Sequence, residues 1–171
     1  MENTTKQKKC VNISFMKRGL LIFWAGCLSY VLHGQDIGIG EWQYHVSFQK
    51  GIAVADAGDI VYCASELGMF SYNKSDNSVN RLTRVQGLSD IGITDIAYCE
   101  EEGTTVVGYS NGNIDLIGVR QVVNMEDIKR ADFPGVKRIN KITISNALAY
   151  LSCGFGIVIV NLERREIVAT Y

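Results

Sequence analysis

Three glycines recur at a constant interval of 44 residues, at Gly68, Gly112 and Gly156. Each lies inside a segment that predicts a strand, a turn and a second strand. These segments are residues 60–73, 104–117 and 148–161. Repeats of this length form one supersecondary unit each, and such a unit buries its apolar side only by stacking on its neighbours. The repeat therefore predicts a series of similar β units rather than a single mixed core.

Side chains of the same kind align around the three glycines when the segments are superposed. The aligned sets are Tyr62, Val106 and Tyr150; Phe70, Ile114 and Val158; and Tyr72, Leu116 and Val160. The pair Asn111-Gly112 predicts a two-residue hairpin turn, because both central residues of such a turn need a positive φ. Each segment is therefore predicted to be a β-hairpin.

A further strand is predicted before each hairpin and a fourth strand after it. The preceding strands are 52–57, 93–99 and 139–145, and the following strands are 78–83, 120–124 and 166–171. Four antiparallel strands in about 44 residues match one blade of a β-propeller. A β-sandwich with coincidental glycine spacing is the alternative.

We therefore predict an all-β protein, the amino-terminal part of a β-propeller domain that covers residues 35–171. Its three four-stranded antiparallel blades are placed at approximately 51–86, 91–125 and 137–171. A closed propeller has at least ~4 blades, so we expect an incomplete ring. The alternating stretch Trp42–Phe48 predicts one more strand, which in a closed ring would pair with carboxy-terminal strands.

The composition supports short strands and turns rather than helices. The chain has 17 glycines and one proline, and glycine is frequent in tight turns. Beyond the first 35 residues no stretch shows the sustained apolar spacing of an amphipathic helix. We expect almost no helix there.

The first 34 residues predict a secretory signal peptide. Lys17 and Arg18 precede an apolar run over residues 20–32, and the small Gly34 is suited to cleavage. The run is shorter than the ~20 residues of a membrane span. Met16 is the more natural start, which makes residues 1–15 an upstream extension. The alternatives are a lipoprotein signal acylated at Cys27 and an uncleaved anchor helix.

The charge distribution argues against nucleic-acid binding. The whole chain has a net charge of −1, but five of its 17 basic residues and only one of its 18 acidic residues lie in residues 1–34. The remainder is therefore mildly acidic. Nucleic-acid binding requires a basic surface for the phosphates, so no nucleic-acid partner is predicted.

Residues suited to catalysis or metal binding are few. His45 is the one histidine after residue 34, which is too few for a histidine-based triad or zinc site. Cys63, Cys99 and Cys153 have no CxxC spacing and are predicted to be small buried residues. The acidic run 100–102 is predicted to be a solvated hairpin tip. No catalytic residue, cofactor or metal is predicted, and the protein is predicted not to be an enzyme.

One basic segment is a candidate for binding an anionic polymer. Its residues are Lys129, Arg130, Lys137, Arg138 and Lys141, with Asp132 as the one acidic residue among them. Phe133-Pro134-Gly135 predicts a loop that joins the second blade to the third at one face of the disc. The alternative is an ordinary solvated loop.

Several motifs carry a resemblance to known propellers. Gly87-Leu88-Ser89-Asp90, followed by 109–114, resembles the repeats of sensor-type propellers. The wider pattern comprises Ile39–Trp42, Tyr72–Asn77, Gly87–Asp90, Tyr109–Leu116 and Leu151–Val158. It is similar to the amino-terminal propeller of the PorZ family of the type IX secretion system, over essentially all of residues 37–171.

The resemblance implies an exported protein of the periplasm or the outer-membrane cell surface, peripheral to that membrane. It implies two propellers and a small carboxy-terminal β-domain in the whole protein. The implied function is that of a non-catalytic binding and scaffolding subunit of the sortase complex, which attaches cargo to anionic lipopolysaccharide. No ligand residue of the family is transferred to this chain. A periplasmic sensor domain of a two-component histidine kinase is the alternative, and a propeller enzyme is a third class.

Overall fold

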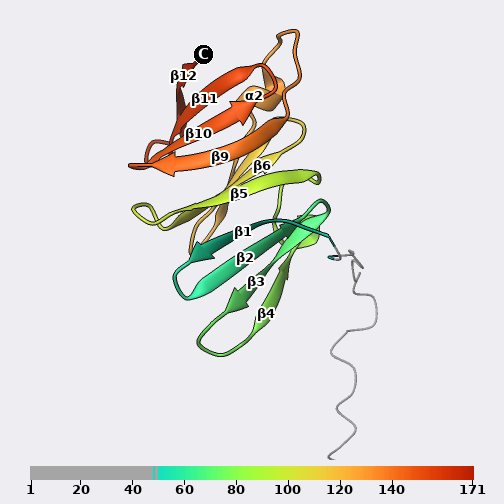
Figure 1. Ribbon diagram of the computed structural model, residues 1–171, viewed down its shortest axis with the longest axis vertical. Coiled ribbons are helices and arrows are strands. Elements are labelled where there is room, and N and C mark those ends of the chain that lie inside the picture. The colour runs from blue at the N-terminus through green and yellow to red at the C-terminus, as the bar shows by residue number, and fades with distance from the viewer. Residues whose placement is uncertain (1–47, 49) are drawn as a thin grey trace, which may run out of the picture. The chain divides into compact units, whose positions relative to one another are not determined.

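The computed structural model describes Phe48 and residues 50–171. Within these residues, twelve strands form three four-stranded antiparallel sheets (Figure 1). Blade one consists of β1 (Gly51–Ala57), β2 (Ile60–Ser65), β3 (Gly68–Asn73) and β4 (Val79–Leu82). Blade two consists of β5 (Ile93–Cys99), β6 (Thr104–Tyr109), β7 (Ile114–Ile117) and β8 (Val122–Met125). Blade three consists of β9 (Ile139–Ser145), β10 (Leu148–Cys153), β11 (Gly156–Asn161) and β12 (Glu166–Thr170).

The strands of each blade pair in chain order, so the first and fourth strands form its edges. The first strands of the blades adjoin one another, with β1 beside β5 and β5 beside β9. The three sheets do not close into a ring (Figure 1). The predicted all-β fold, an unclosed propeller of four-stranded antiparallel blades, is confirmed.

Blade two is covered on both faces, and two apolar clusters result. One cluster joins blades one and two and includes Ala64, Met69, Ile93 and Val107. The other joins blades two and three and includes Val106, Ile114, Leu151 and Val158. All four residues of β7 are buried for this reason. Three of the four are apolar, as expected for a strand that is covered on both faces, and the fourth is Asp115.

Helical structure in the described part is confined to two short segments. The 3₁₀ turn η1 (Arg84–Gln86) follows blade one, and Thr83 caps it by accepting a hydrogen bond from the backbone N–H of Val85. Gly87 ends η1 with a left-handed φ of 119°, a conformation that costs glycine little. The single-turn helix α2 (Asp127–Arg130) lies between blades two and three.

The turn at Asn111-Gly112 differs from the predicted two-residue hairpin. Only Gly112 of the pair has a positive φ, 84°. The N–H of Tyr109 donates to the carbonyl of Asn113 at 3.1 Å, which leaves three residues in the turn. The Asn111 side chain accepts the N–H of Asn113 at 3.0 Å, so this asparagine stabilises the turn through its amide oxygen rather than through a left-handed backbone.

This longer turn shifts the third strand of blade two by one residue. The equivalent second-strand residues Cys63, Val107 and Leu151 lie 44 residues apart. Their partners on the third strands are Phe70, Asp115 and Val158, respectively. The superposition of Ile114 on Phe70 and Val158 was therefore wrong by one residue. A buried aspartate occupies the position that is apolar in the other two blades.

Some predictions fall outside the described residues. They are the signal peptide 1–34 with its cleavage site, His45, and the strand Trp42–Phe48 apart from its last residue. The Phe48 ring lies edge-on to Phe70, with a centroid distance of 6.0 Å. No helix in the described part is long and apolar enough to cross a membrane.

Candidate functional site

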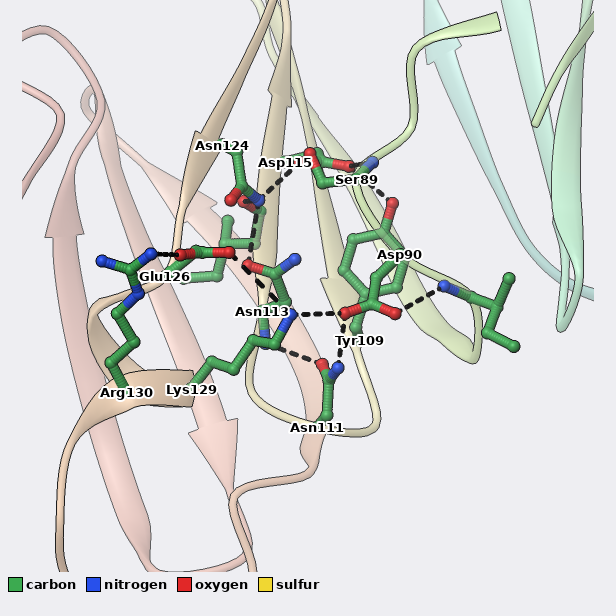
Figure 2. Close-up of polar contacts among 12 residues, drawn as sticks. Ser89, Asp90, Tyr109, Asn111, Asn113, Asp115, Asn124, Glu126, Lys129 and Arg130 are labelled. Atoms are coloured by element: carbon green, nitrogen blue, oxygen red, sulfur yellow. Dashed lines mark hydrogen bonds and ion pairs between the residues drawn. The ribbon is translucent and has the colours of Figure 1, made fainter. Parts of the chain in front are cut away.

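Two residues of the predicted basic segment lie on α2, and both form ion pairs. The Lys129 Nζ atom lies 2.9 Å from Asp90 Oδ2 and 3.9 Å from Glu126 Oε1. Arg130 pairs with Glu126 at 2.5 Å. These contacts, drawn in Figure 2, direct Lys129 toward the 87–90 turn that follows η1.

Lys137 is the third member of the segment, and it binds the end of α2. Its Nζ atom donates to the carbonyl oxygens of Lys129 at 2.9 Å and Ala131 at 2.6 Å. It also lies 5.3 Å from the centroid of the Phe133 ring. The last carbonyls of a helix have no partner within the helix. The ammonium group of Lys137 therefore supplies the hydrogen-bond donors for the end of α2.

The last two residues of the segment lie apart from this group. Lys141 is on β9 and pairs with Asp95 of β5 at 3.1 Å, although its side chain is 68% exposed. Arg138 is exposed and forms no ion pair within the described residues. The structure thus gathers Lys129, Arg130 and Lys137 around α2, and it gives an internal partner to four of the five basic side chains. Binding of an anionic ligand by this segment stays a prediction.

A second polar cluster surrounds Asp115 in the interior of blade two (Figure 2). Its Oδ2 atom accepts the Tyr109 hydroxyl at 2.6 Å and the backbone N–H of Ser89 at 2.8 Å. Its Oδ1 atom accepts the Asn124 side-chain amide at 2.9 Å. The carboxylate therefore holds the 87–90 turn against β6 and β8.

Two ionisable side chains here, Tyr109 in the cluster and Asp90 near it, have shifted pKa values. Burial first, and the charge of Asp115 second, raise the pKa of Tyr109 well above its ordinary value. Its hydroxyl therefore remains a proton donor to the carboxylate. Burial acts to raise the pKa of Asp90, but hydrogen bonds from Lys129 and Asn111 outweigh it and lower the value overall.

Asn113 is the most deeply buried polar residue beside Asp115. Its side-chain oxygen accepts the Asn124 amide at 2.9 Å. Its Nδ2 atom has no hydrogen-bond partner within residues 50–171. The side chains of Tyr109, Asn124 and Asp115 bind one another or Asn113, so the cluster joins the 87–90 turn to the blade.

A buried carboxylate also links blades two and three. Asp95 Oδ2 accepts the backbone N–H of Ile142 at 2.7 Å in addition to its pair with Lys141. The repeat places Asp95 and Lys141 at equivalent positions, because their second-strand partners Gly108 and Ser152 lie 44 residues apart. The sequence thus held a signal for this contact, namely an acid and a base at equivalent positions of the first strands of neighbouring blades.

The remaining residues from the sequence predictions are the three cysteines and the acidic run 100–102. Cys99 and Cys153 are buried and Cys63 is half-buried, and all three are free thiols. Glu100–Glu102 are exposed, although Glu101 accepts the N–H of Ala147 from blade three. Across Phe48 and residues 50–171, no three His, Cys, Asp or Glu side chains gather as metal ligands.

A groove of about 520 Å³ lies between blades one and two. Side chains of β2 to β4 line one wall, and the turn Gly118–Gln121 between β7 and β8 lines the other. A smaller hollow of about 160 Å³ adjoins it and shares Tyr62, Ile117 and Gly118. Neither hollow was predicted, because its walls come from two different repeats.

Comparison with known proteins gives one family and several structural neighbours. Residues 61–171 match the family described as the N-terminal β-propeller domain of PorZ, of the type IX secretion system. A solved structure of PorZ from Porphyromonas gingivalis, an essential bacterial surface component of that system, superposes with a TM-score of 0.72 at 28% identity. The match covers 77% of this chain and 18% of that protein. No curated protein matches.

More distant neighbours share the fold alone. The extracellular domain of the putative one-component system BT4673 from B. thetaiotaomicron has a TM-score of 0.58 at 13% identity, covering 74% of this chain and 18% of its own. The computationally designed Ika4 protein has a TM-score of 0.55 at 14% identity, covering 77% and 79%. The family match spans most of the described residues and agrees with the PorZ superposition. The chain therefore belongs to the family of amino-terminal β-propeller domains of PorZ, a component of the type IX secretion system.

Proposed function

We propose that the protein is a non-catalytic binding and scaffolding subunit of the sortase complex of the type IX secretion system. In this function it is associated with delivery of anionic lipopolysaccharide at the outer-membrane surface. The observation that carries the proposal is the family match over residues 61–171, together with 28% identity to a surface component of the system. Export is assigned to the signal peptide predicted at residues 1–34.

The internal structure agrees with a scaffold. The buried carboxylates Asp95 and Asp115 accept hydrogen bonds from the protein itself, and they join a blade to its neighbour or a turn to its blade. Contacts of this kind hold the blades together, which is what a scaffold requires.

Deletion of the gene in the bacterium that encodes it tests the proposal. Cargo proteins of the type IX system are expected to lose their attachment to the cell surface and to be restored by a plasmid copy. Immunoblots of intact cells, with and without external protease, measure the attachment. Unchanged surface attachment of cargo in the deletion strain would sink the proposal.

The periplasmic sensor of a two-component histidine kinase remains the alternative. The likeness to BT4673, at 13% identity, supports it through the fold alone. The same deletion strain distinguishes the two functions, since loss of a sensor changes transcript levels while leaving cargo attachment intact.

A further inference from the structure

Asp90 brings nitrogen groups from two different segments onto one carboxylate oxygen (Figure 2). Its Oδ2 atom accepts the side-chain amide of Asn111 at 2.5 Å and the Lys129 ammonium group at 2.9 Å. Its Oδ1 atom accepts the backbone N–H of Ile91 at 3.0 Å, which orients the carboxylate. A lysine amine beside a side-chain amide, with a carboxylate to move a proton between them, can form a new amide bond that links the two side chains.

This combination of three groups occurs once within residues 50–171. Two other lysine–aspartate pairs are present there, Lys74 with Asp56 at 2.7 Å and Lys141 with Asp95 at 3.1 Å. Neither of those carboxylates accepts a side-chain amide from another described residue. The ion pair at Asp90 is therefore set apart by the amide that shares its acceptor.

The Asn111 side chain is also held as an electrophile. Its Oδ1 atom accepts the N–H of Asn113 at 3.0 Å. That donor polarises the Cγ atom and stabilises negative charge that develops on Oδ1, as one donor of an oxyanion hole does. The N–H of Gly112, whose nitrogen is the usual nucleophile at an Asn-Gly pair, donates to the carbonyl of Tyr109 at 3.2 Å instead. This competing nitrogen is therefore engaged elsewhere.

The helix that carries Lys129 is packed closely on the turn that carries Asn111. Ile128 is 3% exposed, and a Cβ atom added at Gly112 would lie 2.9 Å from its Cγ2 atom. The Asp90 side chain is only 16% exposed. The three groups are thus held together by the fold, and groups that are oriented in this way react far faster than the same groups free in solution.

We propose that Lys129 and Asn111 form an intramolecular isopeptide bond, with Asp90 transferring the proton. The unprotonated Nζ atom attacks the Asn111 Cγ atom, and Asp90 accepts a proton from Nζ. Asp90 then passes this proton to the Nδ2 atom, the Cγ–Nδ2 bond breaks and ammonia leaves. One amide replaces another, so the step needs no oxidant, reductant or cofactor. The bond links the turn between β6 and β7 covalently to α2.

The protonation of the amine sets the expected rate. Only an unprotonated amine is a nucleophile, and lysine ordinarily holds its proton up to a pH of ~10.4. The charged side chains that face Nζ are the carboxylates of Asp90 at 2.9 Å and Glu126 at 3.9 Å. Hydrogen bonds lower the pKa of Asp90, so its carboxylate is ionised and can accept the proton. The bond is therefore expected to form slowly at neutral pH and faster in alkaline solution.

Peptide mapping of the full-length protein by mass spectrometry tests the bond. Trypsin cleaves after Arg120, which separates peptide 85–120, with Asn111, from the peptide that contains Lys129. After incubation at about pH 9, we expect one linked species that comprises 85–120 and 121–130, because trypsin does not cleave after a modified lysine. Its mass is expected to be lower than the sum of the two peptides by one ammonia. Separate peptides of unchanged mass would overturn the proposal.

Three variants assign the roles. Lys129→Arg keeps a cation opposite Asp90 but removes the amine, and it is expected to abolish the linked species. Asp90→Asn keeps the shape of the side chain but removes the proton acceptor, and it is expected to slow formation of the bond ~10²–10⁴-fold. Lys74→Arg is the matched control, because its ion pair with Asp56 has no asparagine beside it. It is expected to leave the yield of the linked species unchanged.

The same spectra distinguish the bond from deamidation at Asn111-Gly112. Attack by the Gly112 nitrogen also releases ammonia, but it forms a succinimide within peptide 85–120 and links no second peptide. Ammonia loss or deamidation in that peptide without attachment of Lys129 overturns the proposal, as does a linked species in Lys129→Arg. The wild-type measurement decides the question even where a variant fails to fold. It is also independent of the proposed function, which the attachment of cargo tests.

Discussion

The interface between blades two and three buries the larger apolar cluster and leaves a hollow of about 90 Å³, whereas the interface between blades one and two opens into a groove of about 520 Å³. Val158 of blade three is buried at a position that Asp115 occupies in blade two. Ile117 belongs to the cluster between blades one and two. Asp115 lies two residues from Ile117 on the same strand, so its side chain also faces blade one. On the third strands, blade three therefore presents an apolar side chain to blade two, whereas blade two presents a carboxylate toward blade one.

The first strands of the blades also differ between the two interfaces. Asp95 reaches across from blade two and binds Ile142 and Lys141 of blade three. The equivalent residue of blade one is Ala53, since their partners Ala64 and Gly108 lie 44 residues apart. Alanine has no group that could bind the next blade in this way. Similar repeats can thus make contact through a buried carboxylate on one side and leave an open groove on the other.

Truncation in the packed interface is expected to have the largest effect. Leu151→Ala removes a fully buried side chain from the cluster between blades two and three, and such a change costs about 2–5 kcal/mol. Met69→Ala removes a fully buried side chain beside blade two from blade one. It is expected to cost less, because the neighbouring groove lets the site relax. Urea denaturation of the intact protein measures the free energy of unfolding of both variants. Equal losses for Leu151→Ala and Met69→Ala would contradict the difference in packing between the two interfaces.

Removal of the carboxylate between the inner strands is expected to rank second. Asp95→Ala leaves the N–H of Ile142 without its acceptor, and an unsatisfied buried donor costs about 1–3 kcal/mol. Asp95→Asn keeps an acceptor for that N–H and is expected to cost less. Thermal melts of the three proteins measure the difference. A melting temperature for Asp95→Ala equal to that of wild type would show that the contact contributes nothing.

Alkaline pH is expected to lower the free energy of unfolding through Tyr109, which binds Asp115 in blade two. The folded state raises the pKa of Tyr109 well above 10, so its contribution is present below pH 10 and is lost as pH rises further. The loss is at most ~1.4 kcal/mol per pH unit for one group. Stability of wild type and Tyr109→Phe between pH 9 and 11 isolates this residue. The prediction fails if both curves fall with the same slope.

The smallest effect is expected at Asp90, at the edge of the same cluster. Its pKa is lowered in the folded state, so its contribution is present above its ordinary pKa near 3.8 and is lost as pH falls below it. Asp90→Asn is expected to flatten the acid limb of the stability curve. Parallel acid limbs for the two proteins would contradict the assignment to Asp90.

The sequence predicted the blades more accurately than the contacts between them. The 44-residue spacing of Gly68, Gly112 and Gly156 and the alternation along each strand were enough for the hairpins, because strand pairing within a blade joins residues that are near in sequence. The turn at Asn111 broke the alignment by one residue. Its side chain accepts a local backbone N–H, so the pair did not need the double left-handed turn.

The candidate sites were harder to predict because they join distant residues. The spacing of Lys129, Lys137 and Lys141 indicated a basic segment, but their partners Asp90, the end of α2 and Asp95 are supplied by the fold. The groove walls at Tyr62 and Gln121 lie in different repeats, and no pattern within one repeat places them opposite each other.

The sequence by itself determined the repeat, the four-strand unit and the family, since each depends on local spacing and turn residues. Only the tertiary structure decided which charges are neutralised, which aspartate lies in the interior and where a recess remains. The physical reason is that blade-to-blade packing depends on small differences between equivalent positions. Asp115 in place of Val158, or Ala53 in place of Asp95, alters an interface without altering the blade that carries it.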